Sequence, residues 1–307
     1  MPGRSNRKMQ DRKTERVNIS LSVFSCPIFC CCLCIWLTVA AATLCPPPAS
    51  ADESTDAEKA LRVKWQAVYS EIAGSIEMRR DETKLSLEPT PLLFYTNPVR
   101  ATDQHGSMFL WTDQGRPAVI GSIWSALNRT DTSLRNITHE WHSLVEEPDV
   151  QAVRGGQTEW TSGEPGIAWQ ALELTPAPAS SRPTRLVQMR EIARGLTATI
   201  TAEEENELRL MTQPLYRYPE KTSGAIDGAI FVYSLATDPE LILLVEATGP
   251  KDKLTYRVAF ARFGNLAMAV KSGEQTLWTC DRGTPGRSNG KYYLHWRIEQ
   301  RKADLAP

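Results

Sequence analysis

Cysteine is nearly absent from most of this chain. Six of the seven cysteines lie between Cys26 and Cys45, and only Cys280 follows them. If the first 51 residues are removed, as argued below, an internal disulfide and any zinc site with two thiolates are excluded. The 256 residues that remain (307 minus 51) must then be held together by a hydrophobic core, for which they are long enough. We expect Cys280 to be a small buried or half-buried side chain.

A large net charge is also lacking. The chain has 35 basic and 36 acidic residues. The first 51 residues contain six basic and two acidic ones, so 29 basic and 34 acidic residues remain and the rest of the chain carries a net charge of −5. A mildly acidic protein is a poor nucleic-acid binder, and we expect no nucleic-acid partner.

Motifs of the common enzyme classes are missing as well. Beyond residue 51 the sequence contains no Gly-x-Ser-x-Gly, no phosphate-binding loop, no dinucleotide fingerprint, no EF-hand and no Cys-x-x-Cys. We therefore predict no cofactor, and a binding or interaction protein in preference to an enzyme.

Long apolar runs are confined to the amino terminus. Basic residues precede an apolar run at residues 21–44, and the small residues Ala49, Ser50 and Ala51 follow a proline cluster. This order is typical of a secretory signal peptide. We predict that residues 1–51 are a signal peptide cleaved after Ala51, and that the protein is exported to the periplasm or the extracellular space. The alternative is an uncleaved signal anchor, in which residues 21–44 are the one membrane contact.

The rest of the chain predicts an α+β fold dominated by antiparallel β-sheet, with two amphipathic helices at about residues 55–80 and 184–198. In each helix apolar residues recur at steps of three and four. In the first helix these residues are Leu61, Trp65, Val68, Ile72 and Ile76. A Pro/Ser-rich connection at 176–183 separates a first half, residues 52–175, from a second, residues 184–301. The two halves could form one domain or two.

Short β-rich runs bounded by turn residues predict the strands. In the first half they are residues 85–88, 92–95, 107–112, 118–124, 137–145 and 168–174; in the second they are residues 208–211, 229–235, 241–247, 254–262, 266–271 and 292–299. The runs 229–235 and 241–247 are almost wholly apolar, which is typical of strands covered on both faces. We predict tight turns at Asp113-Gln114-Gly115 and at residues 237–240.

The segment His139-Glu140-Trp141-His142 holds the strongest local group of chemically active side chains. On a helix the two histidines would share a face and could bind a metal ion, whereas on a strand Glu140 and His142 share a face and the histidines point apart. The neighbouring residues favour a strand, so we predict no metal site, with His139 and His142 as its weak candidates. Glu140 and His142 are the catalytic candidates, and His105 could join them from a turn as a ligand-binding residue.

Tryptophan is abundant beyond residue 51, and exposed indoles can stack on sugar rings. The residues are Trp65, Trp111, Trp124, Trp141, Trp160, Trp169, Trp278 and Trp296. Most large aromatic residues serve the core. Trp160 lies in a polar, loop-like segment, and we take it as the second candidate for ligand binding.

Four segments resemble uncharacterised exported proteins of planctomycete bacteria. They are residues 104–111, 139–144, 208–218 and 227–232 with 237–240. The likeness covers most of the chain beyond the signal peptide. It implies a bacterial envelope context, and it brings no activity, ligand or catalytic residue with it.

These observations predict an exported binding protein without catalytic activity, whose ligand is not identified by the sequence. A glycan or an envelope protein is the candidate partner. The alternative is a hydrolase or metal-dependent enzyme that uses His139, Glu140 and His142.

Overall fold

The computed structural model describes residues 56–97, 103–172, 176–250, 253–283 and 293–305, with the backbone alone at Ala57 and residues 293–298. The predicted signal peptide, including the apolar run 21–44, lies outside the described residues. Residues Ser54–Pro307 form one compact unit. Neither of the two helices in the described part of the chain has the length and hydropathy of a bilayer-spanning segment.

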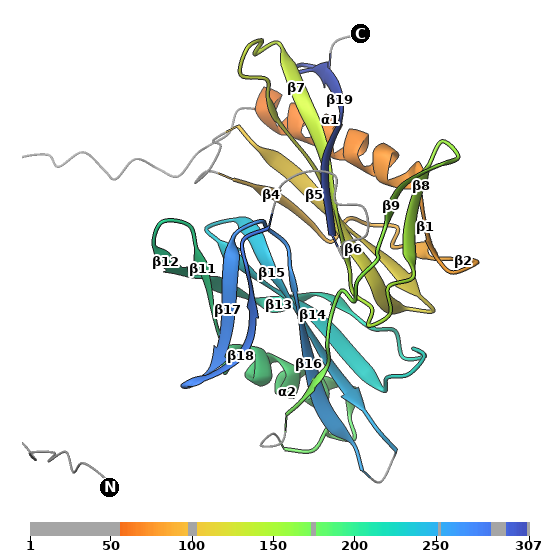
Figure 1. The fold of residues 1–307 in the computed structure, drawn as a ribbon, viewed down its shortest axis with the longest axis vertical. Coiled ribbons are helices and arrows are strands. Elements are labelled where there is room, and N and C mark those ends of the chain that lie inside the picture. The colour runs from red at the N-terminus through yellow and green to blue at the C-terminus, as the bar shows by residue number, and fades with distance from the viewer. Residues whose placement is uncertain (1–55, 98–102, 173–175, 251–252, 284–292, 306–307) are drawn as a thin grey trace, which may run out of the picture. The chain divides into compact units, whose positions relative to one another are not determined.

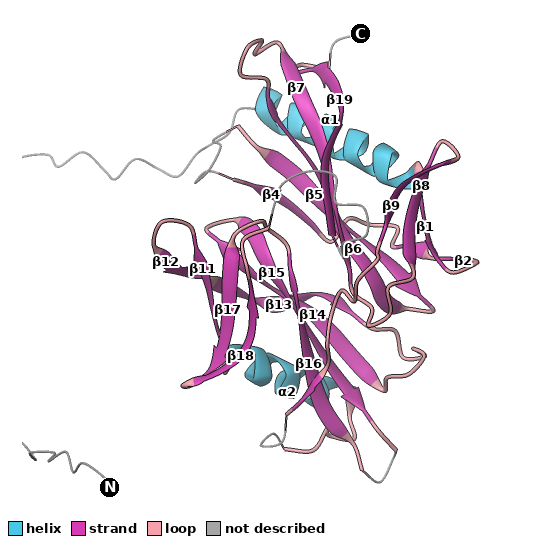
Figure 2. Ribbon diagram, viewed as in Figure 1, coloured by secondary structure: helices cyan, strands magenta, loops and turns pink. Residues whose placement is uncertain are grey.

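The architecture is α+β and mostly antiparallel sheet, as predicted (Figures 1 and 2). Sheet I has the strand order β19-β7-β6-β5-β3, with β4 also paired to β5; sheet II has the order β10-β16-β15-β14-β13. The strands of sheet I are β3 (Ser86–Leu87), β4 (Leu93–Thr96), β5 (His105–Asp113), β6 (Arg116–Leu127), β7 (Leu134–Ser143) and β19 (Tyr293–Lys302). The strands of sheet II are β10 (Gln170–Ala171), β13 (Arg209–Arg217), β14 (Asp227–Leu235), β15 (Asp238–Thr248) and β16 (Thr255–Arg262).

Two smaller sheets and two helices cover the outer faces of sheets I and II. Sheet III has the order β2-β1-β8-β9 and sheet IV the order β12-β11-β17-β18. Sheet III consists of β1 (Ile76–Arg80), β2 (Thr83–Lys84), β8 (Val150–Arg154) and β9 (Gln157–Thr161). Sheet IV consists of β11 (Thr197–Thr201), β12 (Glu205–Glu207), β17 (Ala267–Ser272) and β18 (Gln275–Cys280). Helix α1 (Asp56–Gly74) packs on β5 and β6, and α2 (Arg182–Arg194) packs on β13, β14 and β15 (Figure 1).

Three apolar cores lie between these layers. The first joins α1 and sheet III to one face of sheet I and contains Trp141. The second joins α2 and sheet IV to one face of sheet II and contains Met189. The third packs the other faces of the two large sheets together, through residues such as Ile120 and Leu244. Sheets I and II are therefore covered on both faces.

This double coverage confirms the prediction for the two most apolar runs. They form β14 and β15, which are inner strands of sheet II. Every residue of β14 up to Ser234, and every residue of β15 before Thr248, is buried. Because neither face meets water, the strands need no polar alternation.

Helix α1 ends at Gly74, so the predicted extension to residue 80 is wrong. Ile76 and Met78 belong to β1, where buried residues alternate with the more exposed Glu77 and Arg79. Ile76 follows Ile72 by four residues and fits a helical period as well as a strand period. Pairing with β8 decides between them, because it satisfies the backbone of β1.

Helix α2 runs over Arg182–Arg194, so it starts two residues earlier and ends four residues earlier than predicted. The Ser181 hydroxyl caps its amino end by accepting a hydrogen bond from the amide of Thr184, and Pro183 occupies the first turn. Residues 197–201 form β11 instead of a last helical turn, because the buried Ala198 and Ile200 alternate with threonines that are exposed or half-buried.

One predicted turn is confirmed and the other is shifted. Gln114 and Gly115 have φ of 48° and 80° and close the β5–β6 hairpin. The turn predicted at 237–240 lies at residues 236–237 instead, with Ala236 at φ 54°. Pro239 is already in β15, opposite Ser234 at an irregularity of the ladder where a missing amide is tolerated.

A buried carboxylate links the two large sheets. Glu246 of β15 is fully buried, and the guanidinium of Arg116 from β6 donates to both of its oxygens at 2.9 and 3.0 Å. Arg257 of β16 donates to the same carboxylate at 2.7 Å, and the Tyr218 hydroxyl donates at 2.9 Å. A buried charge is tolerated only when it is paired and hydrogen-bonded in this way.

Replacing this carboxylate should destabilise the junction between sheets I and II. We expect Glu246→Gln to lower the free energy of unfolding by about 2–3 kcal/mol, because Arg116 and Arg257 lose their shared counter-charge. Chemical denaturation measures the change. Glu191→Gln is the control, since its ion pair with Arg194 is exposed and should contribute less than about 0.5 kcal/mol. Equal effects of the two variants would contradict this role of Glu246.

Candidate functional site

Strand β7 determines where the predicted catalytic residues point. His139 and Trp141 share the face toward the first core, where their rings lie 4.9 Å apart. Glu140 and His142 share the opposite face, toward sheet II, and the His142 ring lies 5.0 Å from that of Phe263. The prediction that residues 139–142 form a strand, with Glu140 and His142 on one face, is therefore confirmed.

The two histidines lie on opposite faces and do not form a metal site together. His139 Nδ1 is 3.6 Å from a carboxylate oxygen of Glu159 in β9, behind sheet I. In the part of the chain that the structure describes, no three histidine, cysteine or acidic side chains are placed to hold a metal ion.

Glu140 and His142 form a close pair. His142 Nε2 and Glu140 Oε1 are 2.9 Å apart, and both side chains are buried. The imidazole N–H donates to the carboxylate, which fixes the orientation of both groups. Glu140 also reaches a cavity at the junction of sheets I and II, so the pair has one member in contact with a space that a ligand could occupy.

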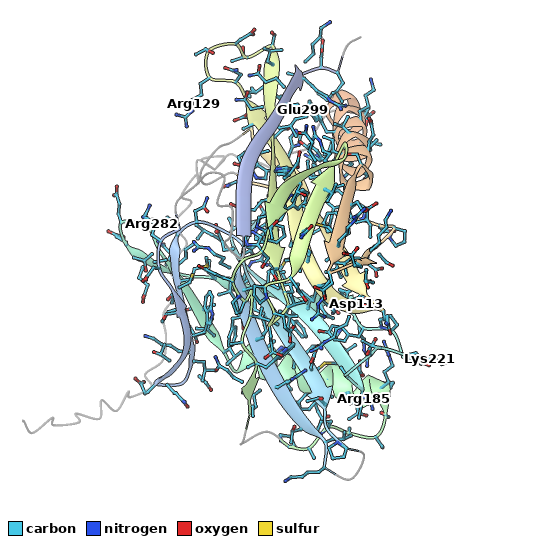
Figure 3. The ribbon with its side chains drawn as sticks, turned by 45° about the vertical axis from the view of Figure 1, so that its right-hand side comes forward. Asp113, Arg129, Arg185, Lys221, Arg282 and Glu299 are labelled. Atoms are coloured by element: carbon cyan, nitrogen blue, oxygen red, sulfur yellow. The ribbon has the colours of Figure 1, made fainter. Side chains whose placement is uncertain are left out.

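We call this space the junction cavity. It has a volume of about 330 Å³, at the lower end of the range for small-molecule sites. Three carboxylates, three amides and three aromatic rings line it, with Arg282 at the edge. They are Glu140, Asp238 and Glu240; Asn97, Gln104 and Asn265; and Tyr95, Trp124 and Phe263. Arg282 is exposed and labelled in Figure 3.

The strand ends that line this cavity also connect sheet I to sheet II by hydrogen bonds. Asn97, just after β4, donates from Nδ2 to Oδ2 of Asp238 in β15 at 2.5 Å. The Thr237 hydroxyl donates to the carbonyl of Thr96 at 2.8 Å. These two hydrogen bonds therefore join the two walls of the cavity at its edge.

The second wall depends on a glycine and a buried arginine. A Cβ on Gly264 would lie 2.2 Å from Oε2 of Glu240, so only glycine lets that fully buried carboxylate take its position. Arg262 holds the same loop by donating to the carbonyls of Gly264 at 2.8 Å and Leu266 at 3.3 Å. These contacts make the wall rigid before any ligand arrives.

The phenol of Tyr95 is a neutral hydrogen-bonding group in this cavity. Burial raises the pKa of Tyr95 well above its usual value, and the negative charges of Asp238 and Glu140 raise it further. Its hydroxyl lies 2.6 Å from that of Ser122. The cavity thus offers carboxylate acceptors together with hydroxyl and amide donors, which is what a ligand with many hydroxyl groups requires.

His105 does not join Glu140 and His142. It begins β5 on the face toward α1, where its Nδ1 lies 2.8 Å from the Tyr69 hydroxyl. The prediction that it could complete the site from a turn is wrong, because the pleat sends its side chain to the other side of sheet I.

The prediction that Trp160 lies in a loop is also wrong. It lies in β9, is only 1% exposed, and packs in the first core. Its polar neighbours belong to an edge strand, whose outward face resembles a loop in sequence. Among the described residues, Trp169 is the tryptophan that lies outside helices and strands, and it is half-buried. Cys280 is half-buried as well, in agreement with the expectation from sequence.

The sequence does not identify Asp238 and Glu240 as site residues, because it predicts a turn for their segment. Their signal was two acidic side chains at the start of an otherwise apolar run. Buried charges in such a strand are unusual unless they serve a network or a ligand. The amides of the cavity carried no signal, because each stands alone in the sequence.

His105 should make the protein sensitive to acid. Burial lowers the pKa of His105 from 6.5 to about 3, and the positive charges of Arg135 and Arg62 add to this effect. Between pH 6.5 and 3 the unfolded chain binds a proton at His105 and the folded protein does not. The contribution of His105 to the free energy of unfolding is therefore fully present above pH 6.5 and is lost as the pH falls toward 3. We expect His105→Gln to reduce the loss of unfolding free energy between pH 7.5 and 4.5 by about 2 kcal/mol. Gln keeps an acceptor for Tyr69, and an unchanged pH profile would contradict the assignment.

Comparison with protein-family models, with curated proteins and with solved structures finds no match to this chain. The resemblance to exported planctomycete proteins therefore stays a prediction. Any function must be argued from the geometry of the described residues.

Proposed function

We propose that this is an exported, non-catalytic binding protein that takes a saccharide in the junction cavity. The observation that carries the proposal is the lining of this cavity, where carboxylates, amides and aromatic rings surround about 330 Å³ between sheets I and II. The export part of the proposal is supported by the sequence of residues 1–51.

The lining matches the chemistry of a sugar better than that of an apolar ligand. Sugar hydroxyls donate to carboxylates and both donate to and accept from amides, while the C–H face of the ring packs on aromatic side chains. The half-buried Trp124 supplies such a surface, and Gln104, which immediately precedes β5, lines the same cavity. The rigid wall around Gly264 favours binding, because little conformational entropy is lost when the ligand enters.

A glycan array followed by calorimetry on the best ligand tests this proposal. We expect Gln104→Ala to weaken the affinity at least about fivefold, the loss expected for one hydrogen bond in a desolvated site. Gln275→Ala, at the exposed start of β18 in sheet IV, is the matched control and should bind as the unaltered protein does. A flat array with folded protein would refute saccharide binding.

A hydrolase is the second candidate, and the Glu140–His142 pair is the observation that favours it. In that case Glu140, which lines the cavity, would take a proton from the water that attacks the anomeric carbon and return it to the departing sugar oxygen as the glycosidic bond breaks, while His142 orients the Glu140 carboxylate. Bound saccharide would then be cleaved, and Glu140→Gln would abolish product while retaining binding. Glu203→Gln, at an exposed position, is the control. Absence of product from every saccharide that binds would exclude this candidate.

A further inference from the structure

A second cavity lies at the junction of sheets I and II, on the side of the Glu246 cluster. It has a volume of about 170 Å³, which is below the range of drug-sized sites, so its ligand must be small. We call it the Trp169 cavity. Its charged lining consists of Arg80, Asp113, Arg116, Glu146 and Glu147.

One wall of this cavity is cationic. Arg116 and Arg257 share the single carboxylate of Glu246, so this cluster carries one positive charge in excess. Arg116 uses Nε and Nη2 for Glu246, which leaves Nη1 outside the bidentate contact. Nη1 lies 3.6 Å from where a Cβ of Gly224 would be, and both residues line the cavity. A guanidinium edge of this kind fits a carboxylate.

Carboxylates lie directly beside Arg116. Asp113 is its cross-strand partner in the β5–β6 hairpin, and the charge of the exposed Glu146 acts on its guanidinium. Arg80 is the counter-charge of Glu147 at 2.8 Å, of Asp149 at 2.8 Å and of Asp113 at 3.7 Å, so three carboxylates share one guanidinium and negative charge is in excess. Each carboxylate oxygen has more than one acceptor position, so Asp113 and Glu146 can still take an ammonium group. Asp113 is labelled in Figure 3, at the end of β5.

Trp169 makes the cavity rigid and gives it an apolar surface. Its ring lies 4.3 Å from the Arg257 guanidinium and 5.6 Å from that of Arg116. Stacking between guanidinium groups and an indole restricts both partners. The cationic wall is therefore held in place by Glu246 and by Trp169 together.

We propose that the Trp169 cavity binds a small free α-amino acid. Arg116 receives the α-carboxylate, and Asp113 with Glu146 receives the α-ammonium group. A simple anion would face the carboxylates beside Arg116, and a simple cation would face the excess positive charge of the Glu246 cluster. An α-amino acid carries its two charges on adjacent groups, so it can place one against Arg116 and the other against the neighbouring carboxylates, and the small volume favours short side chains.

Calorimetric titration with L-alanine, propionate and ethylamine tests the proposal. L-Alanine should bind, and the other two, which carry one charge each, should bind at least about tenfold more weakly. Glu146→Gln changes an exposed side chain and should weaken L-alanine about fivefold without affecting folding. Glu274→Gln, an exposed residue in the β17–β18 turn, is the matched control and should leave the affinity unchanged. Arg116→Lys should weaken L-alanine as well, because a lysine cannot offer a planar pair of donors.

Three outcomes would overturn the proposal. They are no heat of binding with millimolar L-alanine, equal binding of propionate, which would indicate an anion site, and equal binding of ethylamine, which would indicate a cation site. An unchanged affinity of Glu146→Gln and Arg116→Lys would also overturn it, since the ligand would then lie elsewhere. Saccharide binding in the junction cavity is measured separately, so the failure of one proposal leaves the other intact.

Discussion

The buried carboxylate of Glu246 is the constraint on which the junction of the two large sheets depends. Apolar faces such as those of β6 and β15 can slide over each other with little change in buried area, because the hydrophobic effect is not directional. A buried charge is different, since it must meet its partners at hydrogen-bonding distance. Arg116 can reach Glu246 only when sheets I and II are packed in one arrangement.

Both cavities follow from this arrangement. The apolar contact of the third core ends where the polar ends of strands begin. Strands of both large sheets line the junction cavity, whereas the Trp169 cavity is lined by strands of sheets I and III and by the connections at Trp169 and at residues 223–224, which lead into strands of sheet II. The hydrogen bond between Asn97 and Asp238 connects the sheets beside the junction cavity, and the Glu246 cluster connects them beside the Trp169 cavity. Binding at either place would stabilise the packing of the sheets, because a ligand that contacts both binds the folded state alone.

The two cavities differ in the kind of ligand their charges suit. In the junction cavity the carboxylates lie among amides and aromatic rings, which suits a neutral molecule with many hydroxyl groups. In the Trp169 cavity a guanidinium and carboxylates lie side by side, which suits a small molecule that carries both charges. The Glu140–His142 pair belongs to the first cavity, and it orients one acceptor there even if it performs no chemistry.

The sequence by itself determined the class of the fold, most strands of the two large sheets, and the fact that Glu140 and His142 share one face of β7. These features depend on side-chain periods of two or about 3.6 residues, which a short window of sequence contains. Strands β8, β9, β11 and β18 were missed, because they are short and partly polar and gain stability from pairing with distant segments. Only the tertiary structure placed Asp238 beside Asn97, or Arg116 on Glu246, because these contacts join residues more than a hundred positions apart. It also decided that Trp160 is buried while Trp169 lines a cavity, since burial depends on which sheet covers a residue and the local pattern does not record this.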